Sequence, residues 1–419
     1  MTHQELLDFA RLHADDDLQR LALDARKYPG IDIPRAIAQI DGRRRARLKL
    51  PTLAAEEGVE YPVHLSMEQC SSELTARYKA SLCPAGGGAM ADLTGGFGVD
   101  CYFIGQQFSR RTYIERNEEL CRIARHNYRQ LGFEADVVCA DCTDYLQQME
   151  PVDLIFIDPA RRDAAGARTY ALADCTPDIT SLMPLLRQKC RRLLVKLSPM
   201  LDWRVLIPSE THPQPLPSER GDGFASEIHI VSVDNECKEL LMVGPTPDAS
   251  RGEGRLVCVN LRTNAEPQIF ETTFTAAQQT TLPSRSGGVG GGLLGLGGEF
   301  PFLYEPNASL MKAGCFGELC SRFGVSPVGP NSHLFVSSEQ VADFPGRSFH
   351  IERTTTMNRR ELKAALDGIS HANIATRNFP LSPAELRKRL KLKDGGNDYI
   401  FATTATGGIH LLFICRKIG

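Results

Sequence analysis

The chain of 419 residues contains no apolar run of the ~18–20 residues that a membrane-spanning helix requires. Its charge is nearly balanced at −3, which excludes a polycation that coats nucleic acid without specificity, so any nucleic-acid site must be a local patch. The acidic start of the chain lacks the basic and apolar regions of a secretory signal peptide. We therefore expect a cytoplasmic protein whose 13 cysteines are reduced, buried thiols.

Motifs for metal binding are also scarce. The ten histidines form no H-x-x-x-H pair, which leaves little support for a metal site. Cys139 and Cys142 form a C-x-x-C, but no second pair stands at a suitable spacing. We expect no bound metal, and we expect these two cysteines to be small residues of a pocket or core.

Changes in pattern divide the chain into four regions, in keeping with the two to four domains that its length suggests. We expect a helical region over 1–62 and an α/β domain over 63–245. A β-rich connecting region with a glycine-rich loop is expected over 246–320, followed by an α+β domain over 321–419. The eight glycines of Gly287–Gly298 are not followed by Lys-Ser/Thr, so a flexible linker is favoured over a phosphate-binding loop.

The region 1–62 has the apolar spacing of amphipathic helices. One pattern runs from Leu6 to Ala25 and is broken at Pro29-Gly30, and a second helix is expected with Pro34 as its first residue. The second helix runs into a basic stretch, which is either a solvated helix end or a phosphate-binding patch. Its basic residues are Arg43, Arg44, Arg45, Arg47 and Lys49.

The region 63–245 alternates short apolar strands with amphipathic helices, which predicts a mostly parallel sheet with both faces covered. The expected strands are Ala89–Leu93, Thr112–Ile114, Ala135–Cys139, Leu154–Ile157, Leu193–Leu197, Glu227–Val233 and Leu240–Val243. The last two leave no room for a helix between them, so we expect an antiparallel hairpin at one edge. Before it, the proline-rich and polar stretch Pro208–Gly223 is expected to be a loop. The predicted fold is α/β, with a Rossmann-like sheet of seven strands.

A glycine-rich turn follows the first expected strand and opens a helix, in Ala91–Asp100 (ADLTGGFGVD). Glycine at such a turn lets a ligand approach the backbone closely. The dinucleotide motif G-x-G-x-x-G fails because its third glycine is replaced by Cys101, which weakens a nicotinamide oxidoreductase hypothesis. Acidic residues stand at successive strand ends: Asp92, Glu115, Asp141 and Asp158. Any one of them is as well explained by a turn or a surface position; the ordered set at the edge where such sheets bind ligands indicates a site.

Asp92–Gly98, with the form D-x-x-G-G-x-G, resembles the first motif of class I S-adenosylmethionine-dependent methyltransferases. The resemblance implies that Glu115 accepts hydrogen bonds from the ribose hydroxyls, Asp141 accepts from the adenine amino group, and Asp158 lies beside the methyl group. Upstream, Gln69 and Ser71 are candidates for the methionine end, although Ser71 or Ser72 would equally serve as a helix N-cap. The implied cofactor-binding residues are Gln69, Asp92, Thr94, Gly95, Gly96, Phe97, Gly98, Glu115, Arg116, Asp141 and Cys142.

The loop after the fourth expected strand carries the candidate catalytic residues Asp158, Pro159 and Arg161. Methyltransferases that act on base amino groups usually have Asp/Asn-Pro-Pro and an aromatic residue here, whereas this chain has Asp-Pro-Ala-Arg. Asp158 and the Pro159 carbonyl can still accept from an amino group, and Arg161 or Arg162 would replace the aromatic platform by stacking or by contacting a phosphate. No cysteine follows the fourth or fifth strand closely, and Cys175 could approach only through a long loop. We therefore expect a nitrogen or oxygen acceptor rather than a pyrimidine carbon.

Two strings of the C-terminal region, Tyr304–Gly314 and Ala372–Gly396, resemble the bacterial methyltransferases with a THUMP-like module. THUMP modules proper bind RNA, so the resemblance implies an RNA partner. The region also carries basic residues on two expected helices, which are either an RNA-binding patch or solvated helix faces. These residues are Arg359, Arg360, Lys363, Arg387, Lys388, Arg389, Lys391 and Lys393. Within the second string, Ser382-Pro383 with Glu385 predicts a capping box at a helix start.

These observations favour an S-adenosylmethionine-dependent methyltransferase that modifies a nitrogen of an RNA base, with tRNA or rRNA as partner. The candidate RNA-binding residues are Arg43, Arg44, Arg45, Arg162, Arg387, Lys388, Arg389 and Lys391. Two alternatives remain open. One is a non-catalytic RNA-binding protein that retains the cofactor pocket, and the other is a methyltransferase for a small molecule or a protein, in which the C-terminal module is a lid or a dimer contact.

Overall fold

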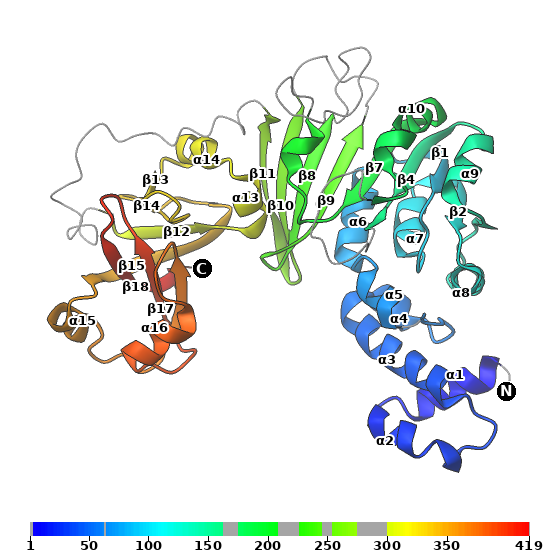
Figure 1. The fold of residues 1–419 in the computed structure, drawn as a ribbon, viewed down its shortest axis with the longest axis horizontal. Coiled ribbons are helices and arrows are strands. Elements are labelled where there is room, and N and C mark those ends of the chain that lie inside the picture. Colours follow the sequence, from blue (N-terminus) through cyan, green and yellow to red (C-terminus); the bar gives the residue numbers. More distant parts are fainter. Residues whose placement is uncertain are drawn as a thin grey trace. The chain divides into compact units, whose positions relative to one another are not determined.

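The structure is a computed structural model that describes residues 3–62, 64–161, 175–207, 226–244, 254–274 and 300–418. The chain forms two compact units (Figure 1). The first comprises Met1–Ile228 and Glu239–Gly252, and the second comprises His229–Lys238 and Glu253–Gly419. The expected loops Pro208–Gly223 and Gly287–Gly298, and the candidate residue Arg162, lie outside the described residues.

The first unit begins with helices, as expected. They are α1 (His3–Leu12), α2 (Leu18–Leu23), η1 (Ala25–Lys27), α3 (Ile33–Lys49), α4 (Pro51–Ala55) and α5 (His64–Gln69). The second expected helix is α3, whereas the first is divided. The expectation of one amphipathic helix from Leu6 to Ala25 was wrong, because Asp17 starts a new helix by accepting hydrogen bonds from the backbone N–H groups of Gln19 and Arg20. Pro34 is the second residue of α3, not the first, since Asp32 is the N-cap.

The sheet of the first unit has the strand order β9-β7-β4-β1-β2-β3. Its strands are β1 (Gly87–Asp92), β2 (Phe108–Glu115), β3 (Asp136–Cys139), β4 (Val152–Ile157), β7 (Cys190–Leu197) and β9 (Glu236–Gly244). The first five run parallel to their neighbours, and β9 pairs antiparallel with β7. The sixth expected strand, Glu227–Val233, is β8. A small pair that the sequence did not predict, β5 (Ala160–Arg161) and β6 (Cys175–Thr176), lies beyond β4.

Helices connect the parallel strands, as crossovers between parallel neighbours require (Figure 1). These are α7 (Val99–Gly105), α8 (Glu118–Gln130), α9 (Cys142–Gln148) and α10 (Ile179–Lys189), preceded by α6 (Glu73–Ser81) and followed by η3 (Trp203–Leu206). The central strands are buried on both faces: Met90, Ile155 and Leu194 are each at most 1% exposed. This double burial explains why the sequence shows continuous apolar runs there instead of alternation. The expected α/β, Rossmann-like fold is confirmed.

The second unit is an α+β structure. It contains β8, β10 (Arg255–Arg262) and β11 (Ala265–Thr273), and a seven-stranded sheet of order β13-β14-β12-β15-β18-β17-β16. The strands of that sheet are β12 (Phe302–Pro306), β13 (Ser326–Pro327), β14 (Phe335–Ser337), β15 (Gly346–Thr356), β16 (Asn373–Arg377), β17 (Asp398–Thr404) and β18 (His410–Ile418). Its helices are α13 (Ala308–Ala313), α14 (Phe316–Phe323), α15 (Arg359–Ala365) and α16 (Pro383–Leu390). The predicted capping box of Ser382 and Glu385 is confirmed at the start of α16.

The C-terminal sheet buries side chains on both faces. Along β18, Leu411 and Phe413 belong to one apolar cluster, whereas Leu412 and Ile414 belong to another. This alternation follows from the two-residue period of a strand. The second cluster includes Leu386 of α16, so that helix is held by the apolar face it presents to the sheet.

The cysteines are free, as expected, but most are not buried. Six are buried, six are half-buried and Cys139 is exposed. Cys139 is therefore not a core residue. None of the described helices is long and apolar enough to cross a membrane.

Candidate active site

The glycine loop after β1 is shaped by its neighbours on β2 and α8. A Cβ atom on Gly95 would lie 2.1 Å from the Tyr113 ring, and one on Gly98 would lie 2.5 Å from the Tyr128 hydroxyl. Gly98 also has φ +86°, a conformation that side chains disfavour. A Cβ on Gly96, in contrast, would meet nothing closer than 3.9 Å. Packing therefore requires two of the glycines, while the backbone at Gly96 is open to a ligand.

Glu115, at the end of β2, is held against this loop. One of its carboxylate oxygens accepts from the Gly96 N–H (3.0 Å) and the other from the Asn117 N–H (2.9 Å). The side chain is only half-buried. Each oxygen has a second lone pair, so the carboxylate is oriented and still able to accept from two hydroxyl groups.

Asp92, at the end of β1, is 1% exposed. Its Oδ1 accepts from the Thr94 N–H (3.0 Å), whereas Oδ2 has no hydrogen-bond partner in the described part of the chain. Burial raises the pKa of Asp92 well above its usual value, and the negative charges of Asp100, Asp158 and Glu115 raise it further. Four acidic groups thus converge on the loop, and a cationic ligand among them would relieve their repulsion.

Asp158 follows β4 and is fixed on two sides. Its backbone N–H donates to Thr94 Oγ1 (2.6 Å), and its Oδ2 forms an ion pair with Lys196 Nζ of β7 (2.5 Å). Burial alone would lower the pKa of Lys196, but the charges of Asp158, Asp100 and Glu239 outweigh burial and raise it. Lys196 therefore stays protonated, and among the described residues Asp158 Oδ1 receives no hydrogen bond.

Behind this pair lies a buried ionic cluster. Lys79 of α6 is 0% exposed, and its Nζ lies 2.8 Å from Glu239 Oε1 of β9 and 3.2 Å from Asp100 Oδ1 of α7. Ser71 donates to Asp100 Oδ2 (2.7 Å) and accepts from Lys79 (3.1 Å). A buried charge requires such partners, because an unpaired one would lose its hydration without compensation. Ser71 thus orients Asp100. Ser72 is the N-cap of α6, in agreement with the alternative that one of these two serines caps a helix.

The other expected cofactor residues are spread over the surface and core of the first unit. Phe97 is a core residue, 5% exposed, whose ring centroid lies 6.1 Å from that of Tyr61. Asp141 is exposed and caps α9 by accepting from the Thr143 N–H (2.8 Å). Cys142 is half-buried, and Arg116 and Gln69 are exposed.

The loop after β4 contains an arrangement that the sequence did not suggest. Pro159 is buried, and the backbone of Arg161 pairs with Cys175 across β5 and β6. Cys175 therefore lies beside the candidate catalytic residues, and it reaches them through the long connection after β5, the one route that the sequence left open. A two-residue strand after a long connection leaves no periodic pattern from which this pairing could be predicted.

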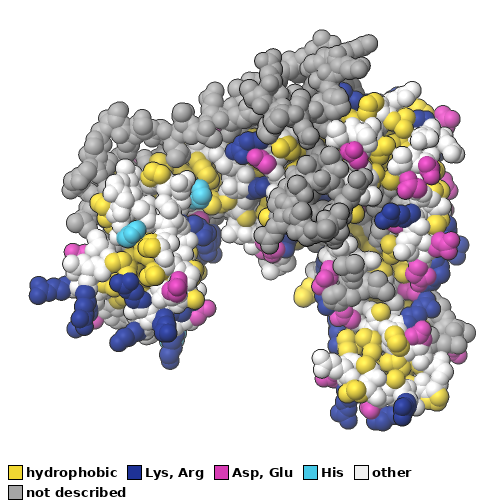
Figure 2. Space-filling model, in the orientation of Figure 1, with side chains coloured by type: hydrophobic (Ala, Val, Ile, Leu, Met, Phe, Trp, Pro, Cys, Tyr) yellow, Lys and Arg dark blue, Asp and Glu magenta, His cyan; other side chains and the backbone are white. Residues whose placement is uncertain are grey.

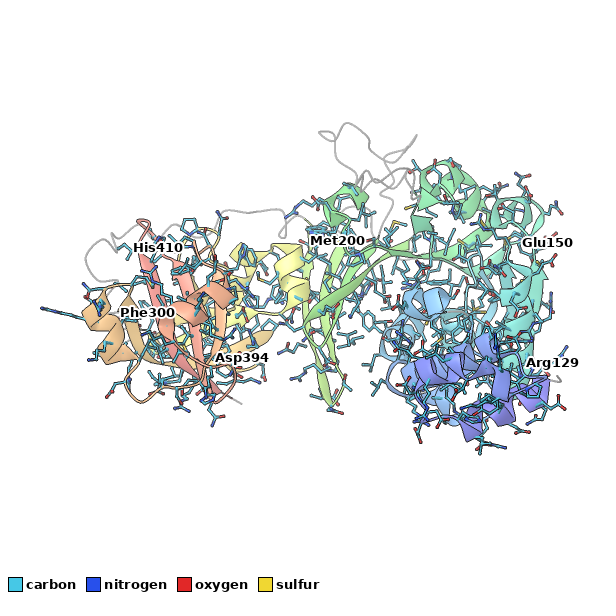
Figure 3. All side chains as sticks on the ribbon, turned by 60° about the horizontal axis from the view of Figure 1, so that its bottom comes forward. Arg129, Glu150, Met200, Phe300, Asp394 and His410 are labelled. Carbon is cyan, nitrogen blue, oxygen red and sulfur yellow. The ribbon has the colours of Figure 1, made fainter. Side chains whose placement is uncertain are left out.

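The basic candidates divide into paired and unpaired residues. Arg44 donates to the carbonyls of Ala14 (2.8 Å) and Asp16 (2.5 Å), and Arg45 pairs with Asp41 (2.9 Å). Arg387 pairs with Asp394 (2.5 Å), which is labelled in Figure 3. The other basic candidates of the second unit have exposed side chains: Arg359, Arg360, Lys363, Lys388, Arg389, Lys391 and Lys393. Figure 2 shows basic side chains gathered over the part of the second unit where Figure 1 draws α15 and α16.

Sequence reasoning missed Lys196, Lys79 and Glu239 as site residues. Each had a signal in the sequence. Lys196 and Glu239 are charged residues in apolar strands, and Lys79 stands next to an alanine in an expected helix. Their partners are 38 and 160 residues away in the chain, so the pairing itself was not predictable. Nowhere in the described ranges do three or more His, Cys, Asp or Glu side chains gather as they would around a metal ion.

Similarity to a solved structure decides the family. The chain is similar over its whole length to a protein of Porphyromonas gingivalis W83, assigned as a methyltransferase, with 32% identity and a TM-score of 0.81, and the match covers 100% of both chains. This chain belongs to the class I S-adenosylmethionine-dependent methyltransferases with a THUMP-like domain. The family predicted from the glycine motif and the C-terminal strings is confirmed.

Further similarities agree with this family. Residues 346–417 match the THUMP domain-like family, and residues 302–345 match a ferredoxin-like domain. A protein of Mycobacterium tuberculosis, from the strains CDC 1551 and H37Rv, is 24% identical over 385 residues, or 89% of this chain and 94% of that protein. It is named an uncharacterized S-adenosylmethionine-dependent methyltransferase in both strains.

The residues around the glycine loop of this methyltransferase fit S-adenosylmethionine, the cofactor of the family. The open side of Gly96 leaves backbone accessible, and Glu115 has free lone pairs for ribose hydroxyls. The unsatisfied oxygen of Asp92 lies among acids that favour a cation, and the cofactor carries both a sulfonium and an ammonium group.

Proposed function

We propose that this methyltransferase transfers the methyl group of S-adenosylmethionine to a nitrogen of an RNA base. The observation that carries the proposal is the placement of Asp158 between Thr94 of the cofactor loop and Lys196 of β7. One carboxylate oxygen is occupied by Lys196, and the other is left to accept a hydrogen bond. The match to the THUMP domain-like family supports RNA as the substrate class.

The proposed cofactor contacts follow the strand ends. Glu115 accepts from the ribose hydroxyls, Asp141 accepts from the adenine amino group, and Asp92 with Asp100 offsets positive charge near the methionine end. The full set of proposed cofactor residues is Gln69, Asp92, Thr94, Gly95, Gly96, Phe97, Gly98, Glu115, Arg116, Asp141 and Cys142. When bound, the cofactor supplies a methyl group attached to a positively charged sulfur.

The residues of this chain orient the acceptor nitrogen and stabilise the charge that develops on it. Asp158 Oδ1 and the Pro159 carbonyl accept from the acceptor amino group, which directs its lone pair toward the methyl group and offsets the positive charge that the nitrogen gains. Methyl transfer leaves the cofactor as a neutral thioether, and the methylated nitrogen then releases one proton to solvent. Lys196 acts as a positioning residue, because its buried ammonium fixes the rotation of the Asp158 carboxylate. Arg161 is proposed to contact the base or a phosphate.

A pyrimidine carbon is the competing acceptor, since Cys175 lies across from Arg161. Methylation at carbon 5 requires a cysteine that attacks carbon 6 and forms a covalent intermediate. RNA containing 5-fluoropyrimidine would trap that intermediate as an adduct. We expect no adduct, and an adduct that is lost in Cys175→Ser would overturn the nitrogen assignment.

The RNA substrate can be identified in cells. We expect one methylated nucleoside to be present in total RNA from cells with this gene and absent from cells without it, as measured by mass spectrometry of nucleosides. The purified protein should restore it to RNA from the deficient cells. Unchanged RNA nucleosides, with transfer to a protein or a small molecule, would favour the alternative substrate classes instead.

The proposal includes an RNA-binding surface and a location. The proposed RNA contacts are Arg43, Arg44, Arg45, Arg162, Arg387, Lys388, Arg389 and Lys391. The exposed residues among them lie mainly in the C-terminal region 321–419, which we propose as the RNA-binding domain. A cytoplasmic location is supported by the 13 free cysteines, which suit a reducing compartment.

A further inference from the structure

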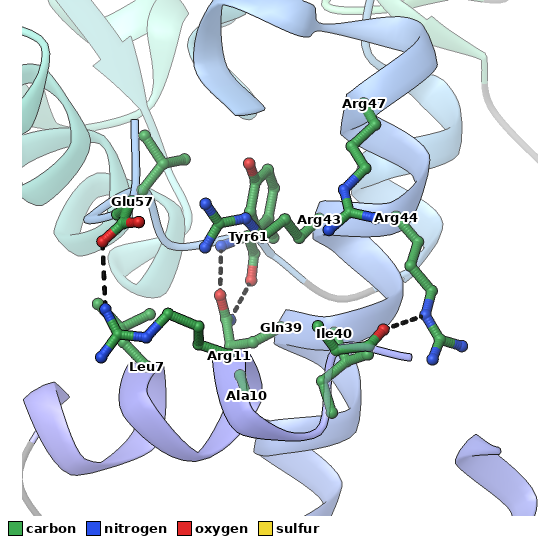
Figure 4. A pocket seen from close by; sticks show the side chains of 12 residues that line it. Leu7, Ala10, Arg11, Gln39, Ile40, Arg43, Arg44, Arg47, Glu57 and Tyr61 are labelled. Carbon is green, nitrogen blue, oxygen red and sulfur yellow. Dashed lines mark hydrogen bonds and ion pairs between the residues drawn. The ribbon is translucent and has the colours of Figure 1, made fainter. Parts of the chain in front are cut away.

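A pocket lies among the N-terminal helices of the first unit, and none of the residues that we assign to the cofactor is part of its lining (Figure 4). Its lining comes from α1, α3 and the segment that follows α4. Four arginines line it, Arg11, Arg43, Arg44 and Arg47, against the single carboxylate of Glu57. Positive charge is therefore concentrated in one small hollow of a chain whose net charge is −3.

Two of these arginines are already engaged. Arg11 pairs with Glu57 (3.1 Å) and Asp8 (2.7 Å), and Arg44 donates to carbonyls of the α1–α2 connection. Arg43 and Arg47, one turn apart on α3, form no hydrogen bond or ion pair with the residues that the structure describes. Two guanidinium groups facing one pocket repel each other, and an anion between them would turn this repulsion into attraction.

The pocket wall behind these arginines is rigid. Tyr61 is 3% exposed, and its backbone N–H and carbonyl are both bonded to the Gln39 side chain (2.8 and 2.7 Å). α3 can approach this closely only at Gly42, where a Cβ would lie 2.4 Å from Tyr61 Cβ. The position of Arg43 and Arg47 relative to Tyr61 is thus set by packing and does not depend on a ligand.

Tyr61 also carries an unsatisfied polar group. Its hydroxyl is buried without a hydrogen-bond partner in the described part of the chain. Burial raises the pKa of Tyr61 to about 12, although the charges of Arg43 and Arg47 act to lower it. The two arginines are therefore close enough to act on this hydroxyl, which is a donor in need of an acceptor.

We propose that this pocket binds a phosphate group of the RNA backbone through Arg43 and Arg47. Guanidinium groups match the paired oxygens of a phosphate. The proposal rests on the proposed function in that RNA is the ligand. It adds Arg47 to the proposed RNA contacts. Arg43 and Arg47 bind this phosphate rather than Arg44 and Arg45, because the guanidinium groups of the latter two already contact other groups of the chain.

The test measures binding without cofactor and without methyl transfer. The full-length protein is titrated into a labelled single-stranded RNA 20-mer at several salt concentrations, and binding is followed by fluorescence anisotropy. Arg43→Gln/Arg47→Gln should weaken binding about three- to fivefold near 0.15 M salt and reduce the slope of log K against log salt by about 0.7, as expected for one lost phosphate contact. The control, Arg20→Gln/Arg26→Gln, removes the same charge from exposed positions of α2 and η1 and should change neither quantity beyond error.

A second arm separates RNA from free phosphate. At constant ionic strength, inorganic phosphate should displace RNA more effectively than chloride does from the wild type and the control, but not from Arg43→Gln/Arg47→Gln. Phosphate that binds at these arginines without affecting RNA would overturn the assignment to RNA. Equal affinity and equal slope in the double variant and the wild type would overturn the pocket itself.

The outcome of this binding test can be distinguished from the outcome of the methyl-transfer test. An RNA that binds here with the expected salt dependence but is never methylated would remove the proposed reaction and keep the pocket. Far-UV circular dichroism and the calorimetric affinity for S-adenosylmethionine should be the same in the double variant and the wild type, which establishes that the first unit is folded. A wild-type protein that binds no RNA overturns both proposals.

Discussion

Asp92 is the most deeply buried acid at the glycine loop, and this burial predicts a pH-dependent stability. Its folded-state pKa is raised above the unfolded value, so between the two pKa values the folded state binds more protons than the unfolded chain. The free energy of unfolding therefore falls as pH rises from about 4. Asp92→Asn should remove this loss and stabilise the cofactor-free first unit at pH 7 by about 1–3 kcal/mol, while weakening cofactor binding.

The measurement of Asp92→Asn can be restricted to the first unit. Trp203 is the sole tryptophan, and it is fully buried in that unit, so its fluorescence during denaturant unfolding reports on this unit. The stability difference between variant and wild type should be larger at pH 7 than at pH 4.5. A difference that does not depend on pH would contradict the role assigned to the Asp92 charge.

Glu115 should supply a measurable part of the cofactor affinity. Glu115→Ala removes charge-assisted hydrogen bonds to the ribose and should weaken S-adenosylmethionine binding by about 2–3 kcal/mol in calorimetry. The matched control is Glu118→Ala, which removes the same charge from an exposed position of α8 three residues later. An unchanged affinity in Glu115→Ala would count against this pocket.

Asp158 and Lys196 should act on methyl transfer rather than on cofactor binding. Asp158→Ala should lower kcat at least about 10²-fold with little change in cofactor affinity, since its contact is made to the acceptor. Lys196→Met should lower kcat in the same way by releasing the carboxylate. Because the pKa of Lys196 is raised, its ammonium group loses its proton only above the pH at which lysine usually titrates. The contribution of the ion pair to kcat should therefore be constant from pH 7 to 9. Full activity in Asp158→Ala would refute the assignment.

At the scale of elements, apolar runs and caps predicted most of the fold. All seven expected strands overlap observed ones. The central strands were the easiest to predict, because strands buried on both faces leave a continuous apolar run. The acids at their ends were predictable for the same reason, as a strand end fixes where Glu115 and Asp158 lie. The break between α1 and α2 was missed because the apolar spacing continues through it, and only the Asp17 cap marks the new start.

What the sequence could not show was pairing between distant elements. Lys196 and Asp158 belong to different strands, and their contact depends on the parallel register of β4 and β7. The partners of Glu305 in β12 could not be predicted from the sequence Tyr304–Gly314 either. In the structure its buried carboxylate accepts from Arg347 of β15 and from Arg377 of β16 (2.7 Å).

Glu305 should therefore hold the C-terminal sheet together. Glu305→Gln leaves two guanidinium groups without their carboxylate and should destabilise the second unit by about 1.5–3 kcal/mol, a value limited by the partial exposure of both arginines. The Trp203 transition of the first unit provides an internal reference. Glu318→Gln, which breaks a surface pair with Arg322, should cost less than about 1 kcal/mol. Equal costs for the two variants would contradict the proposed role of Glu305.

For the whole molecule, we expect most of the RNA affinity to come from the C-terminal basic residues. Lys388→Gln/Arg389→Gln/Lys391→Gly should reduce the slope of log K against log salt by about 2, or 0.7 for each phosphate contact. Glycine is chosen at position 391 because Lys391 has φ +58°, which glycine adopts without strain. Anisotropy titrations compare this loss with that of Arg43→Gln/Arg47→Gln. A smaller loss in the triple variant would place the main contact surface in the first unit.

The buried Lys79 has a consequence for the order of events during synthesis. Its partner Glu239 is 160 residues later in the chain, on β9, and Lys79 is 0% exposed in the complete fold. A nascent chain that ends before β9 would have to bury an ammonium group without that carboxylate, so the closed form of the cofactor domain is disfavoured on the ribosome until about residue 244 has emerged. Such a delay would keep an incomplete enzyme from closing around its cofactor.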